Sequence, residues 1–302
     1  RGLKVSQSDL VKNYIFGQSA ARLAEVQQLW SYVKGALETL DEEDITMTFL
    51  RQSLIAMNGY LKETDVYERV QSSVKGAQSS VNFVTELESL ANDYVAIASP
   101  QSEKWNEYPS KVRASLKVLQ LFDLKPFRPL MLAIARRFTV KETALAYERL
   151  VAYAVRLIIA STTRSGSVEQ PLARAAKQIF DGDIQTAKDL ASLLAPIIPS
   201  DDLFRQAFEV ATVSQAKFAR YYLRSIEMSS SGDQDAWMIP NDDTDVINLE
   251  HVLPLKPKDN WPSDDEEAVK TYSKRMGNMA LMIAKDNSDL KSSAFGDKKA
   301  AF

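Results

Sequence analysis

Apolar residues along most of this 302-residue chain recur every three or four positions, which is the spacing of an α-helix with one buried face. One such stripe lies within residues 21–40 and carries Leu23, Val26, Leu29, Trp30, Val33 and Leu37. Strand-like alternation of apolar and polar residues is scarce before residue 245. The pattern therefore predicts a mainly α protein, in which residues 39–228 form a multi-helix domain.

Proline and glycine residues separate the predicted helices. A first helix is expected to begin at Ser8, and another at Asp44 or Thr46. The other predicted ranges are 21–40, 64–79, 81–97, 109–121, 126–137, 140–159, 167–181, 184–194 and 200–227. These helices show no convincing repeat of fixed length, so a solenoid is not predicted.

The pattern changes after the last of these helices. Residues 229–244 are rich in Ser, Gly and Asp and have no apolar period, which predicts a linker between domains. Beyond it, the pattern predicts two strands and a short last helix, at 246–252, at 279–283 and from Asp286 or Asn287. Residues 245–302 are thus predicted to form a small domain of two strands followed by a helix.

Composition and motifs exclude several classes of protein. The chain has no cysteine, which rules out disulfides and thiolate zinc sites and is compatible with a reducing cytoplasm. No apolar run approaches the roughly 18–20 residues that cross a bilayer, so a membrane role is not expected. The sequence has no P-loop, GxGxxG, HExxH or GxSxG motif, so ATPase, dinucleotide, zincin and serine hydrolase functions lack support.

The net charge of −3 hides two segments of opposite charge. Residues 38–107 hold 13 acidic and 5 basic residues, whereas residues 111–164 hold 11 basic and 3 acidic residues. The second segment, here called the basic block, includes Arg136 and Arg137 and would attract nucleic acid by its long-range field. The alternative is that these side chains are solvated outer faces of helices that pair with the acidic segment. The sequence leaves both interpretations open.

The chemistry of the chain centres on one residue, because His251 is its single histidine. It follows Glu250 at the end of a predicted strand, and Asn278 and Asn287 follow on the second strand-to-helix segment. An imidazole takes a proton from water near neutral pH, as phosphodiester hydrolysis requires. Carboxylate and carboxamide oxygens suit a hard cation such as Mg²⁺, which neutralises charge on the leaving oxygen. The set predicts His251 as the base, with Glu250 and Asn287 as metal ligands.

This prediction carries a geometric condition. Adjacent side chains on a strand point to opposite faces, so Glu250 and His251 share a pocket only where the strand ends or kinks. Pro254, shortly after, favours such an irregular exit. Asn278, at the turn into the second strand, is expected to hydrogen-bond backbone and brace the loop that carries the histidine. The alternatives are that Asn278 is only a turn residue and that Asn287 is only a helix N-cap.

Three ordered motifs extend this set: LEHVLP, then GNMALMIAKDN, then Phe295 followed by Lys298. Together they resemble the C-terminal HNH-like domain of the GmrSD-type restriction endonucleases, over residues 245–302. The order of acid-His, Asn and Asn also resembles the HNH domains of CRISPR effector nucleases. Phe295 is expected to be a core residue.

The resemblance implies a ββα-metal fold in which His251 is the general base and Asn278 braces its loop. It implies that Glu250 and Asn287 bind Mg²⁺ or Mn²⁺. Glu250 departs from broader HNH sites, which more often have Asp or His there, and its longer side chain shifts the ligand oxygen. Lys298 is expected either to contact phosphate or to be a solvated charge.

The start of the chain, RGLKVSQSDLVKNYIF, resembles the end of the ParB-like N-terminal domain of the same family. Residues 1–38 are accordingly expected to be the tail of that domain, leading into the helices. The DGQQR-type motif that is linked to nucleotide use in that domain does not occur here. The chain is therefore expected to be the C-terminal part of a longer protein, and any nucleotide requirement would belong to the segment before it. The alternative is that the family's first activity has been lost.

The predicted function is metal-dependent cleavage of double-stranded DNA, with modified DNA as the expected target, by a restriction protein in the cytoplasm. Oligomerisation through the helical region is a further expectation. The main alternative is a noncatalytic scaffold or partner-binding module whose HNH-like end is degenerate. A third interpretation is a ribonuclease toxin that uses the same site on RNA.

Overall fold

The computed structural model describes residues 6–161, 168–231, 243–257, 261, 266–290 and 292–301. By its internal contacts the chain divides into two compact units, Arg1–Pro199 and Ser200–Phe302. Most of the described residues are helical, and two strands among them form a small antiparallel sheet. The prediction of a mainly α protein is therefore confirmed.

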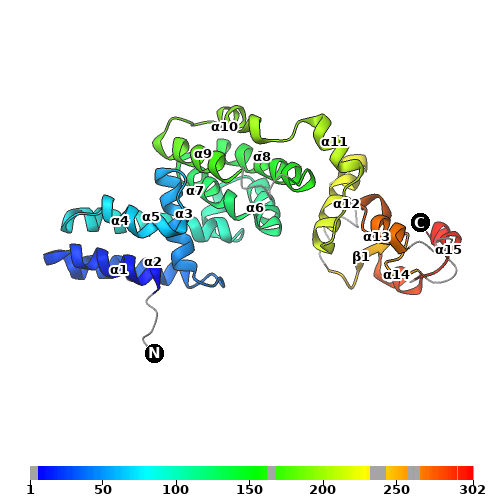
Figure 1. The fold of residues 1–302 in the computed structure, drawn as a ribbon, viewed down its shortest axis with the longest axis horizontal. Helices are drawn as coiled ribbons and strands as arrows, with labels where there is room; N and C mark the ends of the chain where they lie inside the picture. Colours follow the sequence, from blue (N-terminus) through cyan, green and yellow to red (C-terminus); the bar gives the residue numbers. More distant parts are fainter. Residues whose placement is uncertain are drawn as a thin grey trace. The chain divides into compact units, whose positions relative to one another are not determined.

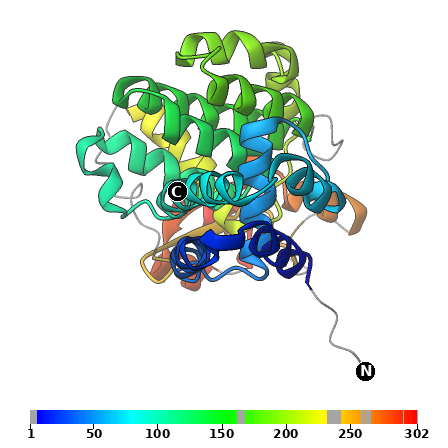
Figure 2. The same ribbon diagram turned by 90° about the vertical axis from the view of Figure 1, so that its left-hand side faces the viewer.

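The first unit is an array of helices, drawn in blue to green in Figure 1. Their bounds are α1 Gln7–Gln18, α2 Leu23–Leu37, α3 Ile45–Asn58, α4 Val66–Ser73, α5 Ala77–Ala98, α6 Ser110–Phe122, α7 Arg128–Arg137, α8 Val140–Ile159, α9 Glu169–Asp181 and α10 Ala187–Leu194. Short 3₁₀ turns accompany them at Ala20–Arg22, Glu63–Asp65, Glu103–Glu107, Lys125–Phe127 and Ala195–Ile197. α7 packs against α3, α5 and α9, and Figure 2 shows α3 running steeply across its neighbours.

Local capping explains where several of these helices begin and end. The Ser6 hydroxyl accepts the N–H of Asp9 at 3.1 Å, and the Thr139 hydroxyl accepts the N–H of Glu142 at 3.3 Å. Each cap satisfies a backbone donor that a first helical turn leaves unpaired. Gly182 ends α9 with a φ of 89°, a left-handed conformation that costs glycine little. α1, α8 and α9 consequently begin or end close to their predicted limits.

Large aromatic side chains form much of the core of the first unit. Phe49, Tyr94, Trp105 and Tyr147 are each at most 1% exposed. The ring centroids of Phe49 and Tyr94 are 5.3 Å apart, and those of Trp105 and Tyr147 are 6.0 Å apart, in edge-to-face contacts. The Trp105 indole N–H donates to the carbonyl of Ala96 at 2.8 Å. These aromatics therefore pack the interior and are not platforms for stacking nucleic-acid bases.

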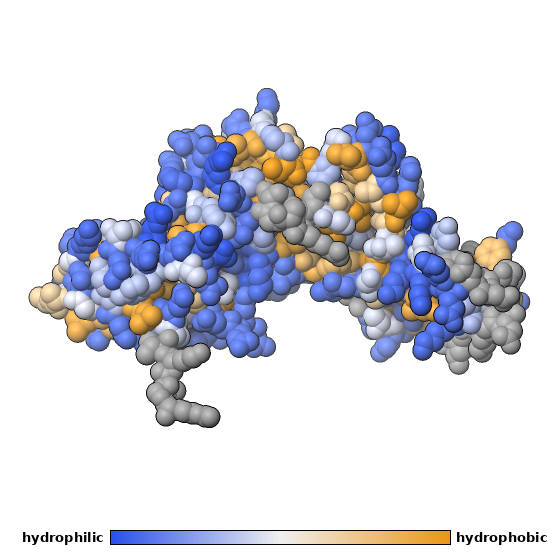
Figure 3. All heavy atoms as spheres, in the orientation of Figure 1, coloured by the Kyte–Doolittle hydropathy of each residue, from blue (hydrophilic) through white to orange (hydrophobic). Residues whose placement is uncertain are grey.

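Polar and charged side chains cover much of the outer surface of this unit, and apolar patches lie between them (Figure 3). The 22-residue α5 buries Leu87 and Leu90, while Asn82 and Thr85 on its other side are exposed. Figure 3 shows mainly hydrophilic residues over α1 and α4 on the visible face. Among the described residues, no helix combines the length and the apolar character needed to span a membrane.

The second unit surrounds the small sheet with helices. Its elements are α11 Asp201–Glu209, α12 Ala216–Ser231, β1 Ile247–His251, α13 Glu266–Ser273, a 3₁₀ turn at Met276–Asn278, β2 Met279–Ile283, α14 Ala284–Leu290 and α15 Phe295–Ala301. β1 and β2 pair antiparallel, with Ile247 opposite Ile283. α12 and α14 each contact both strands. The two predicted strands are confirmed to within one residue at each end.

Residues 64–79, expected as one helix, are interrupted. α4 ends at Ser73, and the backbone turns at Gly76 with a φ of 81° before α5 begins at Ala77. Glycine adopts this left-handed conformation without the steric cost that other residues meet. The apolar period continues across the break, which is why periodicity alone did not reveal it.

Residues 200–227, expected as one helix, are also divided, into α11 and α12. Between them Thr212 forms an isolated antiparallel bridge with Arg275, and the N–H of Val213 donates to the carbonyl of Lys274 at 2.9 Å. β-branched residues such as these favour extended backbone. Pairing with a distant segment therefore prevails over the local helical period.

This pairing also moves the expected domain boundary. α11 and α12 belong to the second unit, whereas the sequence placed them in a helical domain over residues 39–228. α12 continues to Ser231, into the expected linker at 229–244, and residues 232–242 of that linker lie outside the described residues. α1 and α2, in the segment expected as a ParB-like tail, pack within the first unit.

β2 continues directly into α14. The strand ends at Ile283 and the helix begins at Ala284, with no intervening loop. The helix thus starts before the expected positions, Asp286 or Asn287. Asn287 lies inside α14, so the alternative in which it serves only as the N-cap does not apply.

Candidate functional site

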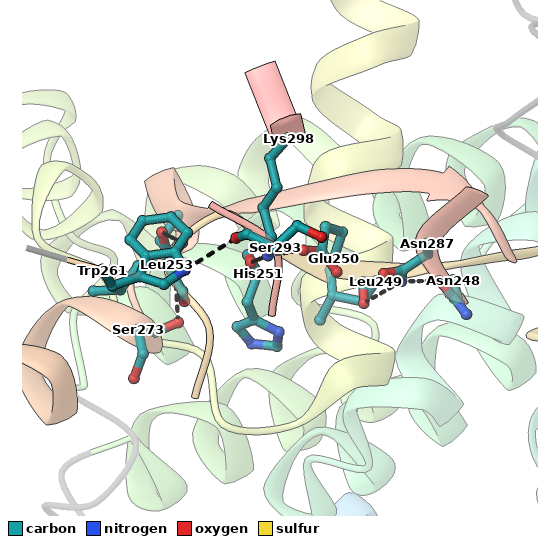
Figure 4. Close-up of polar contacts among 11 residues, drawn as sticks. Asn248, Leu249, Glu250, His251, Leu253, Trp261, Ser273, Asn287, Ser293 and Lys298 are labelled. Carbon is teal, nitrogen blue, oxygen red and sulfur yellow. Dashed lines mark hydrogen bonds and ion pairs between the residues drawn. The ribbon is translucent and has the colours of Figure 1, made fainter. Parts of the chain in front are cut away.

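The candidate site lies where β1 ends and the chain bends away from the sheet. β1 stays paired to its last residue, with Glu250 opposite Ala280 and His251 opposite Met279. The side chains of Glu250 and His251 therefore point to opposite faces. Figure 4 shows the His251 imidazole on the other side of the strand from Lys298. The kink expected between Glu250 and His251 is absent, because the ladder carries past it and irregular backbone begins only after His251.

Asn278 holds the bend that follows His251. Its Oδ1 accepts the N–H of Leu253 at 2.7 Å, and its Nδ2 donates to the carbonyls of Leu253 at 2.9 Å and Ser273 at 3.0 Å. Its own carbonyl accepts the N–H of Val252 at 2.9 Å. Backbone groups outside a ladder need such partners. These are the contacts of a residue that braces the loop, the role expected of Asn278.

His251 is partly buried, and its imidazole makes no hydrogen bond to another described residue. Burial lowers the pKa of the imidazole below its ordinary value. The Glu250 carboxylate acts in the opposite direction on this pKa, and the Lys298 ammonium lowers it further. The ring is therefore neutral at pH 7 and has a nitrogen able to accept a proton.

Glu250 forms a buried ion pair with Lys298 of α15. The exposed fractions of the two side chains are 8% for Glu250 and 1% for Lys298. The same ammonium donates to the carbonyl oxygen of His251 at 2.7 Å and lies 5.8 Å from the centroid of the Trp261 ring. Lys298 was expected on the surface, as a phosphate contact or a solvated charge. Its ammonium instead lies in the interior, because it has a carboxylate and a carbonyl to bind there.

Asn287 faces β1 from α14. Its Nδ2 donates to the side-chain oxygen of Asn248 and to the carbonyl oxygen of Leu249, the latter at 3.3 Å. Asn248 and Glu250 share one face of β1 because they are two residues apart. Figure 4 shows Asn287 meeting Asn248 at one end of the group, away from the His251 ring. The carboxamide oxygen of Asn287 makes no hydrogen bond within the described part of the chain.

The expected metal ligands do not form a cation site in this arrangement. The described residues contain no group of three or more His, Asp or Glu side chains that could hold an ion. The Glu250 carboxylate is neutralised by Lys298, whose positive charge would repel a cation at the same carboxylate. The amide oxygen of Asn287 is then the one expected ligand atom left, whereas Mg²⁺ in proteins is usually bound through at least one carboxylate. Glu250 and Asn287 as a joint ligand set therefore do not fit a divalent cation here.

The two arginines expected to bind nucleic acid lie at the end of α7 in the first unit. Arg136 has ion-pair contacts with Glu86 at 3.8 Å and Asp93 at 3.7 Å. The Arg137 guanidinium lies 4.5 Å from the centroid of the Phe180 ring, and this side chain has no carboxylate partner among the described residues. The contacts of Arg136 thus support the interpretation that the basic block pairs with carboxylates of the acidic segment. Arg137 is exposed and has no carboxylate partner among the described residues.

The fold and the site define a mainly helical protein whose second unit carries a polar cluster on a two-stranded sheet. The cluster consists of Asn248, Glu250, the backbone of His251, Trp261, Asn278, Asn287 and Lys298. A family model described as GmrSD restriction endonucleases, C-terminal domain, matches residues 198–302. The second unit is therefore similar to the C-terminal domain of these enzymes, and the match begins next to the unit boundary at Ser200. No curated protein gives a significant match to the chain.

Two residues of the cluster were not singled out from the sequence. Asn248 is signalled by its two-residue spacing from Glu250, which puts both on one strand face. Trp261 donates its indole N–H to the carbonyl of Ser293 at 3.0 Å, and its ring lies 6.3 Å from that of Phe295. Phe295 was expected in the core, but it is 52% exposed because it begins the short α15 at the surface.

Proposed function

We propose that this chain is the DNA-cleaving part of a restriction system and that His251 is the general base for hydrolysis of phosphodiester bonds. The carrying observation is the His251 imidazole, which makes no hydrogen bond to another described residue and lies at a strand end whose exit Asn278 holds. The match of the second unit to a restriction endonuclease family supports the same class of reaction. The succession of β1, β2 and α14 supports an HNH-like ββα frame for it.

The chemistry assigned to His251 is a single proton transfer. A ring nitrogen takes a proton from a water molecule as the water oxygen bonds to phosphorus and the bond to the leaving sugar oxygen breaks. The leaving oxygen keeps the electron pair and takes a proton from solvent, and the imidazolium afterwards returns its proton to solvent. A positioned base contributes typically about 10² to 10⁴ in rate. Because burial lowers the pKa of His251, the imidazole is ready to accept this proton at pH 7. Asn278 acts through the backbone of the bend and not on the substrate.

The proposal includes a divalent cation, Mg²⁺ or Mn²⁺, because charge that develops on the leaving oxygen has to be neutralised. Glu250 is held by Lys298, so we assign no ligand set and no step to the cation. The test is cleavage after chelation, followed by separate addition of each metal. Cleavage that persists in excess chelator would remove the cation from the proposal.

The proposed substrate is double-stranded DNA, with modified DNA preferred over plain DNA, in the cytoplasm. In the first unit Arg137 is the better placed of the two arginines to contact the phosphate backbone, because Arg136 already faces carboxylates. Association of copies through the helices and a nucleotide requirement set by a preceding domain remain parts of the proposal. Parallel assays on modified DNA, plain DNA and RNA separate DNA restriction from a ribonuclease activity.

The main test replaces the base. His251→Ala is expected to lower the cleavage rate by at least about 10²-fold, because the proton acceptor is lost. Lys299→Ala is the matched control, since Lys299 is an exposed neighbour of the buried Lys298 on α15. Equal cleavage by wild type and His251→Ala, at the same protein concentration and metal, would remove His251 from the reaction.

One observation favours a second candidate, a noncatalytic partner-binding module. The Glu250 carboxylate, an expected metal ligand, is neutralised by a lysine of the same chain. This candidate predicts no cleavage of modified or plain DNA with either metal, whichever residue occupies position 251. It predicts instead that the chain binds a partner equally well with histidine or alanine there.

A further inference from the structure

Two side chains from different elements hold the same peptide unit next to His251. The carbonyl of His251 accepts a hydrogen bond from the Lys298 ammonium at 2.7 Å. The N–H of Val252, at the other end of that peptide bond, donates to the carbonyl of Asn278 at 2.9 Å. Because a peptide unit is planar, fixing both ends fixes the backbone rotation that follows the His251 Cα. Together with the ladder that pairs His251 with Met279, this rotation fixes the Cα and Cβ of His251, the points from which the imidazole extends.

The buried ammonium of Lys298 is placed for this task. Its side chain is 1% exposed, and it binds the Glu250 carboxylate as well as the His251 carbonyl. The Trp261 ring lies 5.8 Å away on a further side. A buried ion pair seldom adds net stability over an apolar pair of the same size, so a contribution to stability does not by itself account for this one. Glu250 supplies the counter-charge that lets Lys298 remain charged in the interior.

We propose that Lys298 is a positioning residue that aims His251, and that Glu250 is the partner of Lys298 and not a metal ligand. The expected loss of kcat on removal of Lys298 rests on the proposed function, whereas the expected change in the orientation of the His251 ring does not. α15 then contributes a residue to the site, although Lys298 lies on the opposite face of β1 from the imidazole (Figure 4).

Two other roles for these residues make different predictions. A Lys298 that contacts phosphate would raise KM for DNA when removed and would lower the salt dependence of binding by about one unit of slope. A Glu250 that binds metal would, when removed, raise the metal concentration needed for half-maximal activity. A positioning role changes neither quantity and lowers kcat alone.

The experiment compares Lys298→Met, the double variant Glu250→Met with Lys298→Met, and the control Lys299→Met, in the full chain. The double variant replaces the buried pair by apolar side chains and is expected to recover most of the melting temperature lost by Lys298→Met. It cannot restore the hydrogen bond to the His251 carbonyl. Its kcat is therefore expected to stay about 10- to 100-fold below wild type, with KM and half-saturating metal concentration unchanged.

A second readout needs no activity, because His251 is the sole histidine of the chain. Its ring ¹H–¹³C signal is identified in an NMR spectrum without further assignment. In wild type and Lys299→Met the signal should be displaced from its position in the unfolded chain. In both Lys298→Met variants it should shift toward the unfolded position or broaden, as the ring loses its fixed direction.

The outcomes separate this inference from the proposed function. An unchanged histidine signal and unchanged kcat in the folded double variant would overturn the positioning role. A raised metal requirement in that variant would restore Glu250 as a ligand and overturn its assignment as a counter-charge. If wild type and His251→Ala cleave DNA equally, the proposed function fails, while the histidine signal still decides whether Lys298 aims the ring.

Discussion

Lysines of the first and second units meet carboxylates in opposite surroundings. Lys111 Nζ lies 2.7 Å from Glu148, with 41% and 45% of the two side chains exposed. In the pair of Lys298 with Glu250 the exposed fractions are 1% and 8%. The first pair gains little in water, because solvent screens both charges. In the second pair both charged groups are excluded from water, so removing either one would leave the other buried without a counter-charge.

The difference shows how little a count of charges says about function. The 11 basic residues of the basic block suggested a surface for nucleic acid. Several of them lie against carboxylates, as Arg128 does with Glu42 at 2.6 Å and with Asp123 at 2.9 Å. The buried Lys298 of the second unit is better evidence for a functional site, because burying an ammonium group requires a specific set of partners.

Removing charge from the buried pair should have the largest effect on stability. Lys298→Met leaves the Glu250 carboxylate buried without its partner, and we expect the free energy of unfolding to fall by about 3–5 kcal/mol. Lys111→Met, at the exposed pair, should change it by no more than about 1 kcal/mol. Urea unfolding of both variants measures this contrast. Similar losses from the two substitutions would contradict it.

Removing the loop brace should have an intermediate effect. Asn278→Ala leaves the N–H and carbonyl of Leu253 without their partner, which should cost about 2 kcal/mol of unfolding free energy. Asn278→Asp retains an acceptor for the N–H and should cost less. Asn82→Ala, at an exposed position of α5, is the control and should stay within about 0.5 kcal/mol of wild type. If Asn278→Ala lowered the unfolding free energy no more than Asn82→Ala does, the bend would not depend on the Asn278 side chain.

The smallest effect is expected at the two arginines of the basic block. Arg137→Ala should lower the salt dependence of DNA binding by about one unit of slope, because its charge has no carboxylate partner among the described residues. Arg136→Ala should lower it less, since Glu86 and Asp93 already offset that charge. Binding measured over a series of salt concentrations compares the two. The reverse order would show that the local carboxylates do not decide which arginine meets DNA.

Local signals in the sequence were sufficient for much of the fold. The helix predicted over residues 140–159 is α8, because Thr139 caps its start and an apolar stripe runs along it. The strands are β1 and β2 because alternation and turn residues are local as well. Asn278 could be assigned to the bend because a turn position and an adjacent strand define its neighbours.

Features that depend on distant partners were not predictable in this way. Lys298 and Glu250 are 48 positions apart in the chain, and nothing in FGDKKAA marks one lysine as buried and the next as exposed. The extended backbone at Thr212 depends likewise on Arg275. A kink was expected at Glu250 because the side chains of Glu250 and His251 were required to lie in the same pocket. In the structure Glu250 and His251 serve opposite faces of a regular strand.

The junction between β2 and α14 limits how this region can change in length. With no loop between Ile283 and Ala284, one inserted residue would turn every later position of the helix by about 100° around its axis. Asn287 would then leave Asn248, and the helix would turn a different side to the sheet. Insertions should therefore be tolerated less well at this junction than at positions between the strands that lie outside the bend at Leu253 and the turn at Met276–Asn278. A library of single-residue insertions across residues 252–290, scored for soluble folded protein, would map that limit.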